Sequence, residues 1–260
     1  MALSWPHCLA HRPVGSLILK SMQAIAGALR LIVIAGLLVA TAATPQTLPL
    51  PQALIRFDSE AGVQLLLDSQ ARRAYWPLSV HFLTQKNQAY CGVASIVMVL
   101  NALGVKAPPA AGYEPFATFT QDNLLNERTE AILPQQTLVR QGMTLTQLGR
   151  ILESYDTRAI VRHADDEGLD RFRNVASQQL STPGGHVVVN YLRRTIGQEL
   201  GGHISPLAAY DARSDRFLIL DVSRYKYPPV WVTATDLYAA MNTVDADNDG
   251  RRRGYVLVGP

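Results

Sequence analysis

The pattern of apolar and polar residues predicts one buried helix near the start of the globular part of the chain. From Gly92 to Leu103 the residues are small, aliphatic or good helix formers, and apolar side chains cover nearly the whole helical circumference. A helix that is apolar nearly all round is a buried one, and Gly104 followed by Pro108 is a typical end. Cys91 therefore lies at the N-terminus of a buried central helix.

The patterns that follow this helix alternate between helical and extended periods. Thr144 is a helix-cap candidate, because Leu145, Leu148 and Ile151 follow it at helical spacing. Residues 53–70 carry mixed helix and strand signals and give no assignment. The elements expected farther along are a short helix at 121–127, a helix after residue 144, a strand at 159–163, a helix at 168–180 and a buried strand at 186–192.

A hairpin is the clearest combination of elements in the sequence. The segment HISPLAAYDARSDRFLILDVSRY, residues 203–225, has two apolar stretches on either side of the polar turn DARSD. Pairing centred at Ala212 places His203 directly opposite Asp221, with Cβ atoms about 5 Å apart. A register shift of two residues keeps both side chains on one face, whereas a shift of one separates them.

The order of these elements predicts the fold class. Helices come first and most strands follow, which favours an α+β domain with an antiparallel sheet over a doubly wound one. In this domain the helical part carries Cys91 and packs on the sheet that carries His203 and Asp221.

The first 44 residues have the layout of an export signal. They contain no acidic residue, three basic ones, and an apolar run at 31–43 that is followed by a Pro-rich stretch. This run is shorter than the roughly 20 residues that span a bilayer core. We expect residues 1–44 to be a leader, either cleaved to release an exported, periplasmic protein or retained as a membrane anchor. Residues 45–260 are expected to form a single domain.

Removing the leader changes the charge and the cysteine count. The formal charge of +3 falls to about zero, so nothing indicates a nucleic acid as partner. Of the two cysteines, Cys8 lies in the leader and only Cys91 remains. An intramolecular disulfide and a cysteine-rich metal site are therefore excluded in the mature chain. The histidines show no metal-ligand spacing, and no metal site is predicted.

A cysteine at a helix start beside a histidine is typical of nucleophilic catalysis. The positive end of the helix and a nearby imidazolium both favour the thiolate. We expect Asp221 to hold the Nδ1 side of the His203 ring and to leave the other nitrogen for the thiol. Gln85, six residues before Cys91, is the candidate donor to the oxyanion, and Gln88 is a nearer competitor. The residues thus predict acyl transfer.

Three long segments resemble one known family. They are QAYCGVASIVMVLNALG, GGHISPLAAYDARSDRFLILDVSRYKYPPVWV and AMNTVDADNDGRRRGYVLV. The chain resembles phytochelatin synthase, specifically the catalytic domain of its short bacterial members, over about residues 76–258. The resemblance implies a papain-like cysteine-peptidase fold with Cys91 as nucleophile, His203 as general base and acid, Asp221 as orienting carboxylate and Gln85 as oxyanion donor.

The resemblance also implies a substrate, which is glutathione. Members of this family cleave its Cys–Gly bond through a γ-glutamylcysteinyl thioester, and the family pattern suggests that Asp245 and Arg253 bind the γ-glutamyl group, with Arg252 as the alternative arginine. The chain lacks the cysteine-rich C-terminal region of plant-type members, so we expect mainly hydrolysis with weak phytochelatin synthesis. No cofactor is required, and heavy-metal ions act as glutathione-bound substrate or modulator. A homodimer is a further expectation.

Two other functions fit the same residues. One is another Cys-His-Asp peptidase of similar fold, and the other is a non-catalytic module that binds thiols or metal–peptide complexes.

Overall fold

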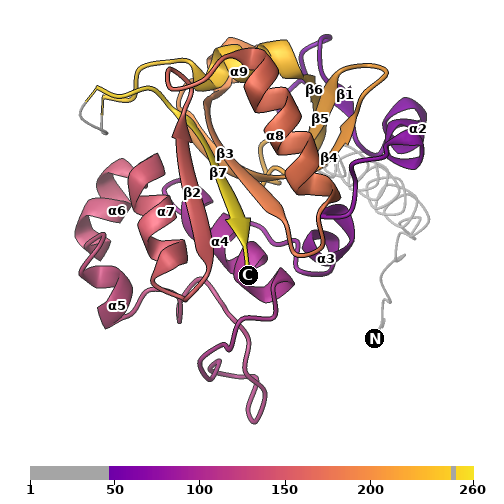
Figure 1. Cartoon of the computed structure of the whole chain (residues 1–260). Coiled ribbons are helices and arrows are strands. Elements are labelled where there is room, and N and C mark those ends of the chain that lie inside the picture. Colours follow the sequence, from indigo (N-terminus) through magenta and orange to yellow (C-terminus); the bar gives the residue numbers. More distant parts are fainter. Residues whose placement is uncertain (1–46, 247–249) are drawn as a thin grey trace, which may run out of the picture. The chain divides into compact units, whose positions relative to one another are not determined.

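The computed structural model describes residues 47–246 and 250–260, and Figure 1 shows their arrangement. The helices are α2 (Glu60–Asp68), α3 (Tyr75–Val80), α4 (Cys91–Ala102), α5 (Glu127–Glu130), α6 (Gln135–Gln141), α7 (Leu145–Glu153), α8 (Leu169–Ser181), the 3₁₀ helix η1 (Arg193–Ile196) and α9 (Ala234–Met241). The strands are β1 (Ile55–Arg56), β2 (Arg158–His163), β3 (His186–Leu192), β4 (Gly202–Asp211), β5 (Arg216–Ile219), β6 (Val230–Thr233) and β7 (Gly254–Gly259).

The described strands form one seven-stranded sheet in the order β1-β6-β5-β4-β3-β7-β2. Every neighbouring pair in this order is antiparallel. Strand β7 inserts between β3 and the edge strand β2, so the last strand along the chain is paired on both sides. The predicted α+β class with an antiparallel sheet is confirmed.

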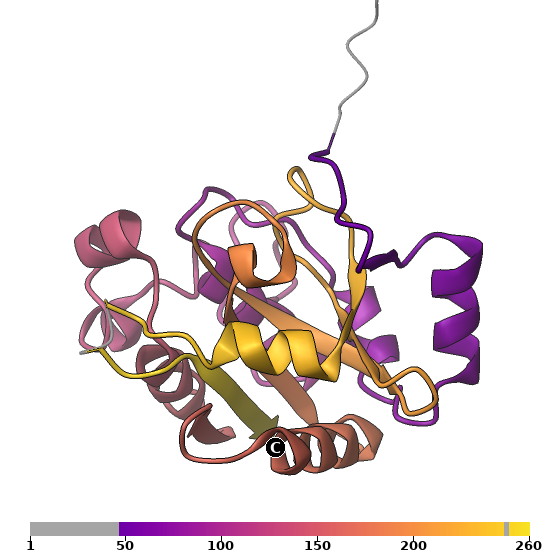
Figure 2. The ribbon, with the colours of Figure 1, turned by 90° about the horizontal axis from the view of Figure 1, so that it is seen from above.

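Helices cover both faces of this sheet. Figure 1 shows α8 in front of β3 and β4 with α4 behind them, and the view from above in Figure 2 also separates these two helices across the sheet. On the α8 side, Phe172 packs against Phe217, Tyr238 and Tyr255, with ring centroids 5.1 to 6.3 Å apart. Burial of these aromatic rings fixes α8 and α9 on the sheet.

The central helix forms because its sequence leaves no polar face. In α4 all residues from Cys91 to Leu100 are buried, which requires apolar neighbours on every side. Ser95 has the one hydroxyl in this stretch, and its single O–H is shared between Cys91 O within the helix at 2.8 Å and Ile204 O on β4 at 3.2 Å. This side chain ties the start of α4 to the start of β4.

Most of the predicted elements are present, and one was misplaced. The helices and strands expected at 92–103, after 144, and at 159–163, 168–180 and 186–192 correspond to α4, α7, β2, α8 and β3. Thr144 caps α7 in a capping box with Gln147, as its position suggested. The helix expected at 121–127 was wrong, because Asn126 caps a helix that starts only at Glu127. The unassigned stretch at 53–70 contains β1 and α2.

The predicted hairpin exists as β4 and β5, but its register differs from the expected one. Near the turn, Tyr210 pairs with Phe217, and a β-bulge between Leu207 and Ala209 then shifts the pairing by one residue. Beyond the bulge Leu207 pairs with Ile219, two residues from the predicted register. The prediction of directly opposed residues was therefore wrong, yet the parity that keeps the two catalytic candidates on one face is preserved.

The leader predicted at residues 1–44 lies outside the described residues. Of the helices that the structure does describe, none has the length and apolar character needed to cross a membrane.

Candidate active site

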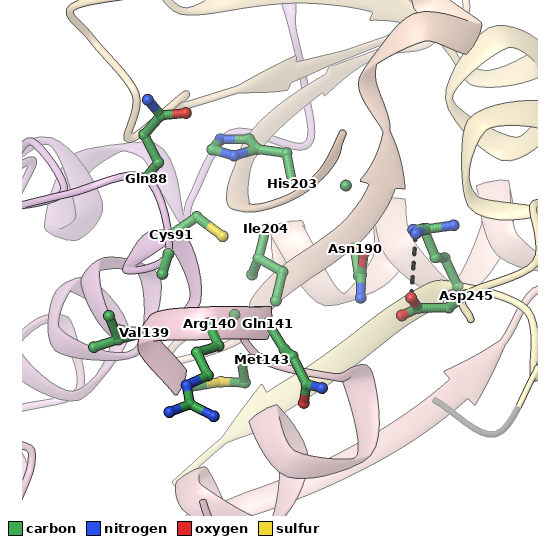
Figure 3. A pocket seen from close by; sticks show the side chains of 14 residues that line it. Gln88, Cys91, Val139, Arg140, Gln141, Met143, Asn190, His203, Ile204 and Asp245 are labelled. Carbon is green, nitrogen blue, oxygen red and sulfur yellow. Dashed lines mark hydrogen bonds and ion pairs between the residues drawn. The ribbon is translucent and has the colours of Figure 1, made fainter. Parts of the chain in front are cut away.

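A cavity of about 280 Å³ lies where the start of α4 meets the start of β4. Cys91 and His203 line one side of it, and Asn190, Asp245 and Arg253 line the opposite side. Figure 3 shows the sulfur of Cys91 near the ring of His203, and the ion pair of Asp245 across the cavity. The cavity therefore joins a nucleophile candidate to a charged binding end.

Cys91 occupies the position that the sequence predicted for it. It is the first residue of α4, and its side chain is buried with only 7% of its surface exposed. The first backbone N–H groups of a helix have no partner within it, and they create positive potential at this end. A thiolate at Cys91 is stabilised by that potential.

His203 and Asp221 are in direct contact, as predicted. Nε2 of His203 donates to Oδ1 of Asp221 at 2.9 Å, and Ser205 Oγ lies 2.9 Å from the same nitrogen. The expectation that Asp221 holds the Nδ1 side of the ring was therefore wrong. Because β4 presents His203 and Ser205 on one face, two residues apart, Ser205 Oγ reaches the same ring nitrogen as Asp221. Nδ1 is then the ring nitrogen left for the sulfur.

The buried groups shift one another toward an ion pair. Burial disfavours the thiolate of Cys91, but a hydrogen bond and the positive charge of His203 outweigh it, and the pKa of Cys91 is lowered. Burial also disfavours imidazolium, yet the charge of Asp221 raises the pKa of His203 above its ordinary value. Burial opposes ionisation of Asp221 as well, but His203 and Arg193 hold its pKa well below the usual range. The cluster thus favours thiolate, imidazolium and carboxylate together.

Asp221 has a second cationic partner, Arg193, which the sequence reasoning missed. Nη1 of Arg193 lies 2.8 Å from Oδ2 of Asp221, and Nη2 lies 2.9 Å from Oδ1. Both side chains are buried, with 3% and 0% of their surfaces exposed. The guanidinium and the carboxylate therefore form a bidentate pair with no access to solvent.

Gln85 lies close to the catalytic candidates but does not line the cavity. Its backbone N–H donates to Val222 O, and its Oε1 accepts from Ser223 Oγ at 2.7 Å. Its Nε2 donates to Asn87 O at 2.6 Å and to Tyr225 Oη at 3.2 Å. These contacts fasten the loop before Cys91 to the loop after Asp221. Gln88, the competing candidate, is exposed and does line the cavity.

The structure separates the two arginines proposed for substrate binding. Nη2 of Arg253 lies 3.2 Å from Oδ1 of Asp245, and both residues line the cavity. Arg252 does not line it, and its Nη1 donates to Asn242 O. Neighbours in an extended segment point in opposite directions, which explains why only one of the two arginines faces the site.

Metal-ligating side chains are scattered in the part of the chain that the structure describes. Across residues 47–246 and 250–260 no group of three or more His, Cys, Asp or Glu residues could hold a metal ion.

The family model described as Phytochelatin synthase matches residues 45–255. The chain belongs to the phytochelatin synthase family. It is 33% identical over 214 residues to glutathione gamma-glutamylcysteinyltransferase 1 of Lotus japonicus, which covers 81% of this chain and 41% of that protein. It is also similar to the enzymes of that name from Arabidopsis thaliana, at 31% identity with 82% and 43% coverage, and from Schizosaccharomyces pombe, at 28% identity with 81% and 50% coverage.

This member of the phytochelatin synthase family spans half or less of the length of those curated relatives. Its matched region contains the complete cavity described above.

Two buried residues of this phytochelatin synthase domain escaped the sequence reasoning. Arg193 directly follows the apolar strand HVVVNYL, and a charged residue at the end of a strand is expected to be exposed to solvent. Asn190 lies inside the same strand and lines the cavity, although only 3% of its surface is exposed. A polar residue within an apolar run was the available signal, since a buried amide needs a partner.

Proposed function

We propose that this domain cleaves the Cys–Gly bond of glutathione through a γ-glutamylcysteinyl thioester on Cys91. The observation that carries the proposal is the single cavity that joins Cys91 and His203 to the Asp245–Arg253 pair. The names of the similar proteins, glutathione gamma-glutamylcysteinyltransferases, support the choice of substrate. A helix that carries the nucleophile, packed on a sheet that carries His and Asp, supports a papain-like arrangement.

The first half of the reaction forms the acyl-enzyme. The Cys91 thiolate attacks the carbonyl carbon of the Cys–Gly bond, and the oxyanion that develops accepts a hydrogen bond from the backbone N–H of Cys91. Nδ1 of the His203 imidazolium gives its proton to the glycine nitrogen as the C–N bond breaks. Glycine leaves, and γ-glutamylcysteine remains bound through its carbonyl carbon to sulfur.

Gln85 is the proposed side-chain donor to the same oxyanion. Its Nε2 lies in a hydrogen bond to the half-exposed Tyr225 at 3.2 Å, the longer of its two contacts. Exchanging this contact for the oxyanion leaves the bond to Asn87 O intact. The gain is the stronger bond that an amide donates to a charged oxygen.

The second half of the reaction releases the acyl group. His203, now neutral, takes a proton from water at Nδ1, the C–O bond forms and the C–S bond breaks, which yields γ-glutamylcysteine. The amine of a second glutathione replaces water in the transfer reaction and yields the chain-extended peptide. We propose that hydrolysis dominates in this chain, and that a heavy-metal ion enters as part of a glutathione complex or as a modulator.

The charged end of the cavity suits the γ-glutamyl group. This group carries an ammonium and a carboxylate on one carbon, which require an anion and a cation side by side. Asp245 and Arg253 provide these charges 3.2 Å apart, and each is at least nine-tenths buried. Both ions of the substrate therefore find partners away from bulk water.

Release of glycine tests the proposal directly. The full-length reduced protein is incubated with glutathione, and glycine, γ-glutamylcysteine and longer γ-glutamyl peptides are quantified by mass spectrometry. We expect glycine and γ-glutamylcysteine in equal amounts, and a γ-glutamylcysteinyl adduct on Cys91 after brief exposure. The Cys91→Ala variant should form neither, whereas Cys8→Ala should behave like the wild type. Absence of glycine release by folded, reduced protein rejects the proposal.

The adjacent arginines offer a matched control for substrate binding. Arg253→Lys should raise KM for glutathione by about tenfold, because a bidentate charged contact of about 1.5 to 3 kcal/mol is weakened. Arg252→Lys makes the same chemical change one residue away and outside the cavity, and should leave KM unchanged. Equal effects of the two substitutions would contradict the assigned binding end.

Location and assembly complete the proposal. We propose that residues 1–44 direct the domain to the periplasm or hold it at the membrane, on the strength of their basic start and apolar run. Fractionation of cells that produce the full chain tests this location. Light scattering tests whether the chain forms a homodimer.

A further inference from the structure

Arg193 is held as tightly as the catalytic candidates themselves. Besides its two contacts with Asp221, its Nη1 donates to Gln198 Oε1, and its Cζ lies 5.2 Å from the ring centre of Tyr227. Its backbone N–H donates to Gly201 O, which closes the loop before β4. The guanidinium therefore has one fixed orientation, with its planar edge against the carboxylate of Asp221.

The carboxylate of Asp221 is shared between two cations. Oδ1 accepts from Nη2 of Arg193, from Nε2 of His203 and from the backbone N–H of Ser223, at 2.8 to 2.9 Å. A buried carboxylate that contacted only His203 would stabilise the imidazolium with the full effect of its negative charge. With Arg193 present, a positive charge of equal size lies on the other side of the carboxylate and opposes that effect.

The charges in this buried cluster balance. In the ion-pair state Cys91 and Asp221 each carry one negative charge, and His203 and Arg193 each carry one positive charge. Tyr191 faces His203 edge to face at 5.7 Å, and burial raises the pKa of Tyr191 above its usual range, so it stays neutral. Two ion pairs lie nearby, Asp245 with Arg253 and Glu199 with Lys226, and Tyr227 caps Arg193. Arg140 also lines the cavity and adds a positive charge on the substrate side.

We propose that Arg193 is a positioning residue that orients Asp221 and offsets its charge, so that His203 both holds and releases its proton. The inference rests on the proposed function, in which His203 must give its Nδ1 proton to the glycine nitrogen and later take one from water. Asp221 alone would stabilise the imidazolium and slow the release of that proton. Arg193 restores the balance without touching the substrate.

Charge-changing variants separate this role from a purely structural one. Arg193→Gln removes a positive charge, which raises the pKa of both Cys91 and His203, so both limbs of the pH–rate profile should move up by about one pH unit. Asp221→Asn removes a negative charge and should move the limbs down. The double variant should return them close to the wild-type values. Arg193→Lys keeps the charge, and its limbs should stay near the wild type even where kcat falls.

Alkylation of Cys91 measures the same quantity without any substrate. The rate of reaction with iodoacetamide is followed against pH in the full chain that carries Cys8→Ser, and its midpoint reports formation of the Cys91 thiolate. We expect this midpoint to rise by about one pH unit in Arg193→Gln. A rise in the midpoint without glycine release from the wild type would reject glutathione cleavage and retain the role of Arg193. Glycine release by the wild type, together with an equal midpoint in Arg193→Gln, would support glutathione cleavage and reject the role of Arg193.

A midpoint that is the same in wild type and Arg193→Gln overturns the proposal, as does a double variant that keeps the full shift of Arg193→Gln. Loss of Arg193 leaves the buried carboxylate of Asp221 with His203 as its one cationic partner, which can prevent folding. In that case Asp221→Asn is compared with the double variant, because both lack the carboxylate at position 221. The double variant must then have the higher midpoint by about one pH unit, and equal midpoints overturn the proposal.

Discussion

Replacing His186 should make the fold more resistant to acid. His186 begins β3 and is 1% exposed, and neither ring nitrogen has a hydrogen-bond partner among the described residues. It shares a face of β3 with Val188 and Asn190 but does not line the cavity. Burial without a partner lowers the pKa of His186 from 6.5 to about 4. The folded protein therefore accepts the neutral ring and resists its protonation.

The lowered pKa sets the sign and the size of the effect. Above pH 6.5 the ring is neutral in both states and contributes no pH dependence. As the pH falls below 6.5 the unfolded chain binds a proton that the folded chain does not, so the free energy of unfolding falls by about 1.4 kcal/mol per pH unit. The loss ends near pH 4, where the folded protein also binds the proton. The total loss is about 3 kcal/mol.

His186→Leu tests this reasoning by urea denaturation between pH 7.5 and pH 4. We expect the variant to gain stability relative to the wild type as the pH falls, by about 3 kcal/mol over the whole range. Other groups that titrate in this range are common to both proteins, so they cancel in the difference. His81→Leu, a change at a half-buried ring at the end of α3, serves as the control and should show a smaller trend. A difference between His186→Leu and wild type that stays constant with pH would refute the argument.

Three further predictions concern small changes around the site. A Cβ at Gly202 would lie 3.3 Å from Nε and Nη2 of Arg253, so Gly202→Ala should displace the guanidinium. KM for glutathione should rise about tenfold at nearly constant kcat. An unchanged KM would contradict this. A Cβ at Gly92 would lie 2.7 Å from Sδ of Met143, so Gly92→Ala should lower kcat. It should also lower the free energy of unfolding, measured by urea titration, by about 1 to 3 kcal/mol, although Ala is the better helix former. A stabilised variant would show that Met143 moves freely. Thr144→Ala removes the cap of α7 and should cost about 1 kcal/mol with unchanged turnover, and a loss of turnover would connect this helix to the reaction.

The proposed role of Arg193 gives a physical reason for a buried cation beside a Cys-His-Asp cluster. An aspartate in the third position of a Cys-His pair adds a full negative charge to a site that already contains a thiolate. Cys91 and Asp221 are both buried, so water and salt do not screen the repulsion between the thiolate and the carboxylate. The bidentate arginine supplies the compensating charge with fixed geometry, which a lysine would not provide.

Much of the candidate site could be predicted from local sequence patterns. Apolar residues on all sides of 92–103 predict a buried helix, and a buried helix that begins at Cys91 fixes the position of the thiol. Two apolar stretches around a polar turn predict a hairpin, and the twofold period of strands places His203 and Asp221 on one face. Each of these inferences depends on residues close together in the chain, where spacing alone determines geometry.

Only the tertiary structure decided the remaining features. The β-bulge between Leu207 and Ala209 shifts the pairing by one residue and so keeps Asp221 on the same face as His203, and no local sequence pattern predicts such a bulge. Arg193 reaches Asp221 across 28 residues because β3 pairs with β4, and Arg253 faces the cavity because β7 inserts beside β3. The sequence by itself therefore determined which local elements carry Cys91, His203 and Asp221. The contacts among their charged side chains depend on strand order and burial, which a single sequence encodes only through the whole fold.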